Sequence, residues 1–389
     1  ASTIFASANN FNGYIITSTA SSFLREAEIL NIGFDGNAAN QASGGAIYLT
    51  SPYKCKLDTL TMKSIKGDAL TLFGYDSSHF GFQNVITNCK SYGGSYAVGG
   101  NYINISLCDA NYIYGNTLGA NKSSIVESAG LDMITGNMLS SSGNYPAIKI
   151  DAAYTEQCLI QGNTFDGCAS YGIEIVNAGT DQVRILNNVF GAGAKSAIMV
   201  DAGQSFIISD NQISDSGLPS SESGIWVQNA NYATITGNHL INLGKWGIRL
   251  DTATYCDVSH NTIINASCIG ANQYSAILLL NSATHNKIES NILFGNASQL
   301  MKYGIQEAAA ADDYNEISLN QITNAQSGGI LKLGTSSVVH ANIGFVTEKF
   351  VSRKGYTCVK EIGGHGIGRV FHTDPFVPAF GKKGKGEIL

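Results

Sequence analysis

A four-residue phrase ending in asparagine recurs through the middle of the chain and constrains its fold more than any other feature. The six copies between Leu131 and Asn265 are Ile134-Thr135-Gly136-Asn137, Ile160-Gln161-Gly162-Asn163, Ile185-Leu186-Asn187-Asn188, Ile208-Ser209-Asp210-Asn211, Ile235-Thr236-Gly237-Asn238 and Val258-Ser259-His260-Asn261. Successive asparagines lie 26, 25, 23, 27 and 23 residues apart. Periods of about 20 to 50 residues indicate a stack of structural repeats, so we expect a solenoid.

A second pattern lies between successive phrases and begins with a small residue. Its copies include Ala147-Ile148-Lys149-Ile150, Gly172-Ile173-Glu174-Ile175, Gly224-Ile225-Trp226-Val227 and Gly247-Ile248-Arg249-Leu250. In an extended strand the two apolar side chains point to one side and the residue between them points to the other. Each repeat therefore predicts two or three short strands that stack in parallel on the next coil, about 4.8 Å away.

The repeat can be followed well beyond its clearest part. Coils begin at about residue 27, and the last phrases end at Asn291, Asn320 and Asn342. Parallel crossovers are normally right-handed. We therefore predict an all-β fold: a right-handed, single-stranded parallel β-helix of about 12 coils over residues 27–348, with residues 1–26 as a cap or an incomplete first coil.

The recurring asparagines have a structural interpretation. Asparagine tolerates the left-handed backbone region better than most residues, so it suits a bend at a fixed place in each coil. Stacked asparagine amides also hydrogen-bond from one coil to the next. We assign these residues to the scaffold and expect no catalytic role for them.

Composition excludes several classes of function. Charged residues make up 13% of the chain, Gly numbers 44 and the net charge is −6, so there is no basic footprint for nucleic acid. No apolar run is long enough to span a membrane, and no cofactor motif or metal cluster stands out. The chain begins Ala1-Ser2-Thr3 without a secretion signal, yet the low charge is typical of an extracellular, cell-surface or virion protein. The eight Cys lack zinc spacing and are predicted to be buried free thiols.

The two repeated patterns resemble the right-handed parallel β-helix proteins of the pectate-lyase-like superfamily over about residues 27–348. The resemblance implies the fold. The superfamily includes polysaccharide lyases, glycoside hydrolases, epimerases, phage tailspikes, adhesins and structural rods, so it does not by itself imply one function.

The last 41 residues differ from the rest. Residues 349–389 contain eight Lys and Arg against three acids, and no asparagine follows Asn342. The stretch from Gly364 to Pro378 resembles a fragment of the methionine aminopeptidases, which implies that His365 matches a metal ligand and His372 a substrate-contacting residue. The family also uses two Asp and two Glu that this chain does not supply around the fragment, so we expect no metal site and an inactive appendage, whose structural use would be to cap the last coil.

Outward-pointing residues of stacked strands become neighbours about 5 Å apart. Aligning the second pattern places Lys149, Glu174, Met199, Trp226, Arg249, Leu278 and Gln306 in one row and Asp151, Val176, Asp201, Gln228, Asp251 and Leu280 in another. Trp226 and Trp246 offer apolar faces to a sugar ring, and Arg249 offers donors to carboxylates or hydroxyls. Asp201 and Asp251, two coils apart, suit an acid and a base at about 9.6 Å.

The candidate site therefore has Asp201, Asp251 and Arg249 as catalytic residues and Trp226, Trp246, Glu174 and Lys149 as substrate-binding residues. Aspartates at strand ends also commonly cap turns, and Lys149 beside Glu174 also fits a plain surface salt bridge. Two functions stay open. One is a carbohydrate-binding or carbohydrate-processing protein, such as a polysaccharide lyase, glycoside hydrolase or tailspike-like depolymerase. The other is a structural or adhesive rod that assembles into homotrimers or fibres.

Overall fold

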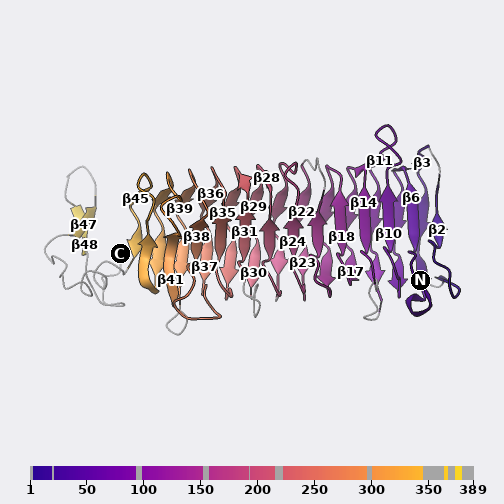
Figure 1. Ribbon diagram of the computed structural model, residues 1–389, viewed down its shortest axis with the longest axis horizontal. Helices are drawn as coiled ribbons and strands as arrows, with labels where there is room; N and C mark the ends of the chain where they lie inside the picture. Colours follow the sequence, from indigo (N-terminus) through magenta and orange to yellow (C-terminus); the bar gives the residue numbers. More distant parts are fainter. Residues whose placement is uncertain are drawn as a thin grey trace.

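The computed structural model describes residues 3–19, 22–92, 99–151, 157–191, 193–214, 222–295 and 300–344, together with two short strands at 363–366 and 373–378. Residues 3–344 form an elongated solenoid whose coils follow one another along the long axis (Figure 1). Three long sheets run the length of this solenoid, and we call them sheets I, II and III. The chain passes through sheet II, then sheet III, then sheet I in each full coil.

Sheet I has 14 strands. They are β1 (Thr3–Ala6), β5 (Ile32–Asp35), β9 (Thr61–Lys63), β13 (Lys90–Ser91), β17 (Thr117–Ala120), β20 (Met138–Ser141), β23 (Thr164–Phe165), β26 (Val189–Phe190), β30 (Gln212–Ser214), β34 (His239–Ile241), β37 (Thr262–Ile264), β40 (Ile292–Phe294), β43 (Gln321–Thr323) and β46 (Ile343–Gly344).

Sheet II has 13 strands. They are β2 (Ile16–Thr17), β6 (Ile47–Thr50), β10 (Leu70–Phe73), β14 (Ile103–Ser106), β18 (Ile125–Ser128), β21 (Ile148–Ile150), β24 (Ile173–Ile175), β27 (Ile198–Val200), β31 (Ile225–Gln228), β35 (Ile248–Asp251), β38 (Ile277–Leu280), β41 (Met301–Glu307) and β44 (Ala325–Leu331).

Sheet III also has 13 strands. They are β4 (Glu28–Leu30), β8 (Lys56–Asp58), β12 (Val85–Thr87), β16 (Tyr112–Tyr114), β19 (Met133–Thr135), β22 (Leu159–Gln161), β25 (Arg184–Leu186), β29 (Ile207–Ser209), β33 (Thr234–Thr236), β36 (Asp257–Ser259), β39 (Lys287–Glu289), β42 (Glu316–Ser318) and β45 (Val338–His340).

The remaining elements are short. A four-stranded sheet lies between sheets II and III near the N-terminus, and a two-stranded sheet lies there in the middle of the rod. These strands are β3 (Leu24–Arg25), β7 (Pro52–Tyr53), β11 (Gly81–Phe82), β15 (Cys108–Asp109), β28 (Gly203–Gln204) and β32 (Ala230–Asn231). One 3-10 turn, η1 (Ala38–Asn40), completes the described solenoid. The strands β47 (Gly363–Gly366) and β48 (Thr373–Pro378) pair antiparallel with each other.

The predicted all-β parallel solenoid is confirmed, and the expected 12 or so coils are close to the 13 or 14 strands of each sheet. The inward row of sheet II shows why this sequence stacks. Ile148, Ile173, Ile198 and Ile225 pair in register from coil to coil, and none of them is exposed. Burying one such side chain contributes roughly 1.5 to 3 kcal/mol, and the row repeats that contribution in each coil.

The recurring asparagines form a hydrogen-bonded ladder where sheet III meets sheet I. Asn163 is typical: its Nδ2 donates to Asn188 Oδ1 at 3.0 Å and to the Ile134 carbonyl at 2.8 Å, and its backbone N–H donates to Asn188 Oδ1 at 2.9 Å. The rungs are Asn116, Asn137, Asn163, Asn188, Asn211, Asn238, Asn261, Asn291, Asn320 and Asn342. The predicted coil-to-coil amide bonding is thus confirmed.

The backbone expectation for these asparagines is wrong. The left-handed residue of each bend is the one before the rung, such as Gly136 with φ 61°, Asp210 with φ 56° and His260 with φ 56°. The side chain of each rung asparagine points inward and bonds to the next rung. The left-handed bend that turns the chain therefore lies at the residue before the asparagine. This explains why Gly, Asn and Asp recur at that preceding place.

The cysteines of the described residues are free thiols, as predicted. Six of them are buried, and Cys268 is half-buried. Cys358 lies outside the described residues. Burial raises the pKa of the Cys89 and Cys168 thiols to about 12. These thiols pack as small apolar side chains inside the stack.

Candidate functional site

The outward face of sheet II carries the row of side chains that the repeats predict. The register pairs Lys149 with Glu174, Met199 with Trp226, and Trp226 with Arg249. Arg249 then pairs with Leu278, and Leu278 with Gln306. The predicted alignment is therefore correct residue by residue. Residues more than 150 positions apart in the sequence become members of one surface.

The guanidinium of Arg249 lies close to two indole rings. Its Cζ atom lies 3.9 Å from the ring centroid of Trp226 and 5.3 Å from that of Trp246. A cation over an indole face is attracted by the ring electrons, with a strength of about 0.5 to 2 kcal/mol. Arg249 Nε and Trp226 Nε1 are buried and have no acceptor among the described residues, so packing and one carboxylate hold this group in place.

That carboxylate is Asp251, which lies two residues along the same strand. Asp251 Oδ2 accepts from Arg249 Nη2 at 2.6 Å, and Asp251 Oδ1 accepts from Asn281 Nδ2 at 2.7 Å. The Asp251 side chain is only 8% exposed, so this ion pair is shielded from solvent. This geometry indicates that Asp251 orients Arg249. That role differs from the acid or base that the sequence suggests for Asp251.

Asp201 lies one residue beyond the end of β27, and Gln228 separates it from Asp251 along the stack. Its side chain is partly exposed. The backbone carbonyl of Asp201 accepts from Asn229 Nδ2 at 3.4 Å. Asp201 is therefore the member of the predicted aspartate pair that faces solvent without an ion pair in the described structure.

Glu174 is a half-buried carboxylate of this face. Burial raises the pKa of Glu174, whereas the positive charges of Lys149 and Lys195 lower it and the charges of Asp201 and Asp151 raise it. Lys149 forms its ion pair with Asp151 on its own strand, so the expected salt bridge to Glu174 is not the one observed. A carboxyl with a raised pKa keeps its proton to higher pH than an ordinary glutamate, which suits a proton donor.

Two further residues of this face escaped the sequence analysis. Lys195 Nζ lies 4.9 Å from the ring centroid of Tyr171. Burial, together with the nearby charges of Glu222, Glu174 and Asp201, raises the pKa of Tyr171 to about 12. One signal points to Tyr171: it stands directly before the small residue Gly172, as Trp246 stands directly before Gly247.

Trp246 forms a second aromatic group with the loop of the next coil. Its ring lies edge-on to Tyr274 with centroids 4.9 Å apart, and Lys245 Nζ lies 5.5 Å from each ring. Together with Arg249 and Trp226, these residues build one continuous surface of rings and cations. We call this surface, from Tyr171 through Trp226 and Arg249 to Tyr274, the sheet II patch.

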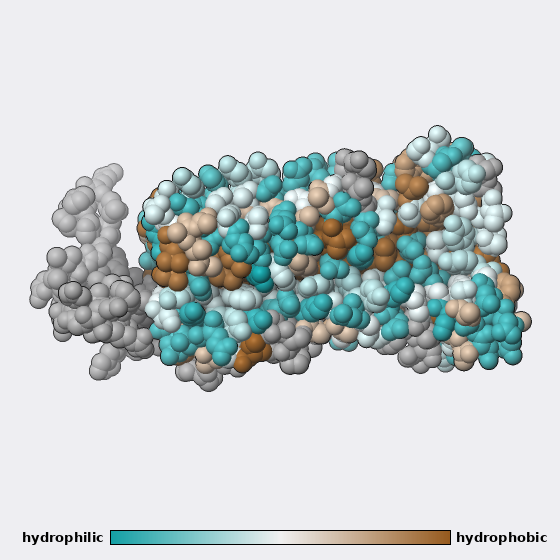
Figure 2. All heavy atoms as spheres, in the orientation of Figure 1, coloured by the Kyte–Doolittle hydropathy of each residue, from teal (hydrophilic) through white to brown (hydrophobic). Residues whose placement is uncertain are grey.

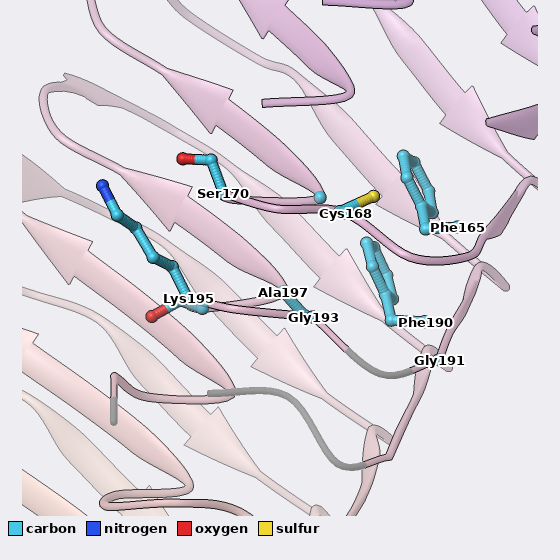
Figure 3. Close-up of a pocket in the computed structure, with 10 residues that line it drawn as sticks. Phe165, Cys168, Ser170, Phe190, Gly191, Gly193, Lys195 and Ala197 are labelled. Carbon is cyan, nitrogen blue, oxygen red and sulfur yellow. The ribbon is translucent and has the colours of Figure 1, made fainter. Parts of the chain in front are cut away.

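A small depression lies at the corner beside the sheet II patch (Figure 3). It offers a water-sized molecule only about 10 Å³ of room and is bounded by Lys195, Gly172 and the stacked rings of Phe165 and Phe190, whose centroids are 4.4 Å apart. The two rings stack face to face from adjacent coils (Figure 3). A volume of this size is below the range of about 300 to 1,000 Å³ typical of small-molecule pockets. A ligand that spans several coils would have to lie along the open face instead.

The visible surface of the rod mixes polar and apolar residues in small patches (Figure 2). The described residues contain no group of three or more His, Cys, Asp or Glu placed to hold a metal ion. His365 lies in β47, and His372 lies outside the described residues. The described part of the chain also contains no helix long and apolar enough to cross a membrane.

Comparison with protein families identifies the class to which this fold belongs. The family model described as the right handed beta helix region matches residues 45–217 and 146–322. The chain is therefore a member of that family, and the predicted right-handed parallel β-helix is confirmed.

Two solved structures and one curated protein illustrate what the chain is similar to. A mutant tailspike protein of E. coli bacteriophage HK620, in complex with a pentasaccharide, matches with a TM-score of 0.57 and 11% identity, over 87% of this chain and 73% of that one. A periplasmic alginate epimerase, AlgG, matches with a TM-score of 0.50 and 12% identity, over 82% and 77%. At sequence identities this low, the two matches show a shared fold and nothing more.

The curated protein is methionine aminopeptidase A of Synechocystis sp., which is 36% identical over 63 residues, or 15% of this chain and 25% of that protein. The chain thus spans about a quarter of the length of this relative. The short match agrees with the resemblance noted in residues 349–389.

Proposed function

We propose that the chain is a carbohydrate-binding β-helix protein that holds a glycan along the sheet II patch. The observation that carries the proposal is the placement of Arg249 against the faces of Trp226 and Trp246, with Asp251 fixing its guanidinium. Indole rings provide apolar faces for sugar rings, and a fixed guanidinium provides directed donors for hydroxyl or carboxylate oxygens. The solved tailspike with a bound pentasaccharide, which shares the fold, supports this choice of ligand.

A catalytic role within this proposal falls to Glu174 and Asp201. Glu174 has the raised pKa of a proton donor, and Asp201 is the solvent-facing carboxylate on the adjacent coil. Arg249 and Lys149 then bind substrate, with Asp251 and Asp151 as their partners. Glycoside hydrolysis uses such a pair of carboxyl groups, one protonated and one ionised. We also propose a location outside the cell, at its surface or on a virion, because the solved tailspike and the periplasmic epimerase that share the fold support it.

The chain offers a direct reporter for the binding test. It contains two tryptophans, Trp226 and Trp246, and both belong to the sheet II patch. Titration with uronate and neutral oligosaccharides is expected to change the intrinsic fluorescence in a saturable way. Reducing-end and unsaturated-product assays on the same glycans test for cleavage. An unchanged emission and an absence of products across both glycan classes would refute the proposal.

The alternative is a structural or adhesive rod that assembles into homotrimers or fibres. The unbroken asparagine ladder favours it, because ten stacked rungs from Asn116 to Asn342 make a long and stable body. Its expected signature is a self-associating protein in analytical ultracentrifugation that leaves the tryptophan emission unchanged with every glycan.

A further inference from the structure

Two glutamates point into the apolar interior of the solenoid from equivalent places. Glu127 lies on β18 and Glu307 on β41, and both are fully buried. The register places them in one inward row of sheet II, because Glu127 pairs with Ile150 and Glu307 pairs with Leu279. The row members between them are apolar: Ile150, Ile175, Val200, Val227, Leu250 and Leu279.

Glu307 is surrounded by donors. Its Oε2 accepts from the backbone N–H groups of Leu333 and Gly334 at 2.7 Å each, and its Oε1 accepts from Asn315 Nδ2 at 3.3 Å. Both carboxyl oxygens of Glu307 therefore have hydrogen-bond donors. Asn315 stands directly before β42, at the entry to sheet III.

Glu127 has a different environment. Its Oε1 accepts from the backbone N–H of Ala129 at 2.6 Å, while its Oε2 is buried and receives no N–H donor from the described residues. The group that it faces is Asp132, which stands directly before β19 in the place that Asn315 occupies before β42. Glu307 accepts a hydrogen bond from the Asn315 amide, whereas at the equivalent place Glu127 faces a second carboxyl group, that of Asp132.

Asp132 is itself fully buried and already engaged. Its Oδ1 accepts from the backbone N–H of Asn111 at 2.7 Å and from Asn111 Nδ2 at 3.0 Å, and its Oδ2 lies 3.2 Å from that same Nδ2. The other titratable groups that act here are the Asp109 carboxylate and the Cys108 and Cys158 thiols. Arg184 acts on the Cys158 thiol. Two negative charges at this place would be costly, since burial and the neighbouring acids both oppose them.

We propose that Glu127 and Asp132 share one proton, which Glu127 Oε2 carries and donates to the Asp132 carboxylate, and that losing this proton at high pH loosens the coil around β18 and β19. The shared proton gives the orphaned Oε2 a partner and leaves one negative charge on the pair. That charge remains on Asp132, where three Asn111 contacts support it.

The acid strengths agree with this geometry. Burial, followed by the charge of Asp132, raises the pKa of Glu127 well above its ordinary value. Burial raises the pKa of Asp132 to about 6, against the hydrogen bonds that lower it. Carboxyls whose pKa is higher in the folded than in the unfolded state take up protons on folding, so this part of the stability is greatest at low pH and declines as pH rises above about 4.5. One proton changes the unfolding constant about tenfold per pH unit.

The test is to compare the wild type with Glu127→Gln, whose amide donates to Asp132 at every pH. The measurements are urea unfolding from pH 5 to 9 and infrared spectra of the carboxyl C=O stretch. The wild-type unfolding constant is expected to rise with pH about tenfold per unit more steeply than that of the variant. A protonated-carboxyl band present in the wild type is expected to vanish in Glu127→Gln and to persist in the control Glu307→Gln.

Equal pH slopes in wild type and Glu127→Gln, or the absence of a protonated-carboxyl band at pH 7, would overturn the proposal. Asp132→Asn provides an independent variant if Glu127→Gln fails to fold, because it recreates the carboxyl–amide contact of Glu307 and Asn315. In Asp132→Asn the new asparagine amide can donate a hydrogen bond to Glu127, as Asn315 donates to Glu307. The infrared band of the protonated carboxyl is then expected to disappear. Its persistence would count against the shared proton.

Discussion

Trp226 and Arg249 are neighbours on adjacent coils, 23 positions apart in the sequence, with the guanidinium 3.9 Å from the indole centroid. Both residues belong to the proposed glycan site and lie on the outer face of the stack. A substitution at this site is therefore expected to alter glycan binding while the rod stays folded. Trp246, whose ring centroid lies 5.3 Å from Arg249 Cζ, is the better residue to remove, since it belongs to a loop and not to a strand of the sheet.

Trp246→Ala is expected to weaken glycan binding about tenfold, which corresponds to roughly 1.4 kcal/mol. The loss has two sources: one sugar-stacking face and one wall of the Arg249 site. Calorimetric titration measures it, and thermal unfolding checks that the fold persists. Tyr232→Ala is the matched control, because Tyr232 is an exposed ring stacked on Tyr255 outside the sheet II patch. Equal losses in the two variants would contradict the assigned site.

Glu174→Gln is expected to keep glycan affinity and to lose cleavage. The glutamine fills the same space, yet it has no proton to donate to a leaving group. Because burial raises the pKa of Glu174, the protonated form extends to higher pH, and the wild-type cleavage rate is expected to fall as pH rises through that raised pKa. Rates measured over a pH series decide the matter: a Glu174→Gln protein with the wild-type profile would exclude Glu174 as the acid.

Asn188→Ala is expected to cost about 2 to 5 kcal/mol of stability, since it removes the four buried hydrogen bonds that the Asn188 side chain makes with Asn163, Asn211 and Ile160. Urea unfolding gives the value. The neighbouring change Asn187→Gly is the control, because Asn187 occupies the left-handed bend with φ 53°, a conformation that glycine adopts freely. We expect less than about 1 kcal/mol for that control. Similar losses at both positions would show that the ladder bonds are not what the rung contributes.

Thiol alkylation of the native protein at pH 8 is expected to spare the six buried cysteines. Burial both blocks access and raises the pKa of thiols such as Cys256, to about 11, so little thiolate is present. Peptide mass spectrometry after brief labelling identifies the modified positions, and labelling in urea gives the full set. Rapid modification of Cys89 or Cys158 in the native state would show that the coils open readily.

The C-terminal segment is expected to have no aminopeptidase activity with added cobalt or manganese. Its resemblance to methionine aminopeptidases includes His365 and His372 but not the carboxylates that such a two-metal site needs. A peptide substrate with an N-terminal methionine provides the assay. Turnover that disappears in His365→Ala would reverse this expectation.

Periodicity explains what the sequence alone could predict. A strict row of apolar residues determines the register, so the neighbours of Trp226 and Arg249 follow from counting. Loop lengths between coils vary, however, and side chains that reach over from loops obey no period. Tyr171, Lys195 and Tyr274 were missed for that reason. The Asp151 partner of Lys149 was missed as well, because the choice between two nearby carboxylates depends on side-chain rotamers.

The asparagine ladder has one more consequence. Each rung needs only an identical neighbour above and below, so the body of the rod has no preferred number of coils. Duplication or deletion of one 21- to 30-residue unit would leave every remaining rung satisfied. The number of coils in such a molecule can therefore change during evolution without loss of the ladder. The sheet II patch is made of residues that differ from coil to coil, so it occurs at only one position along the rod.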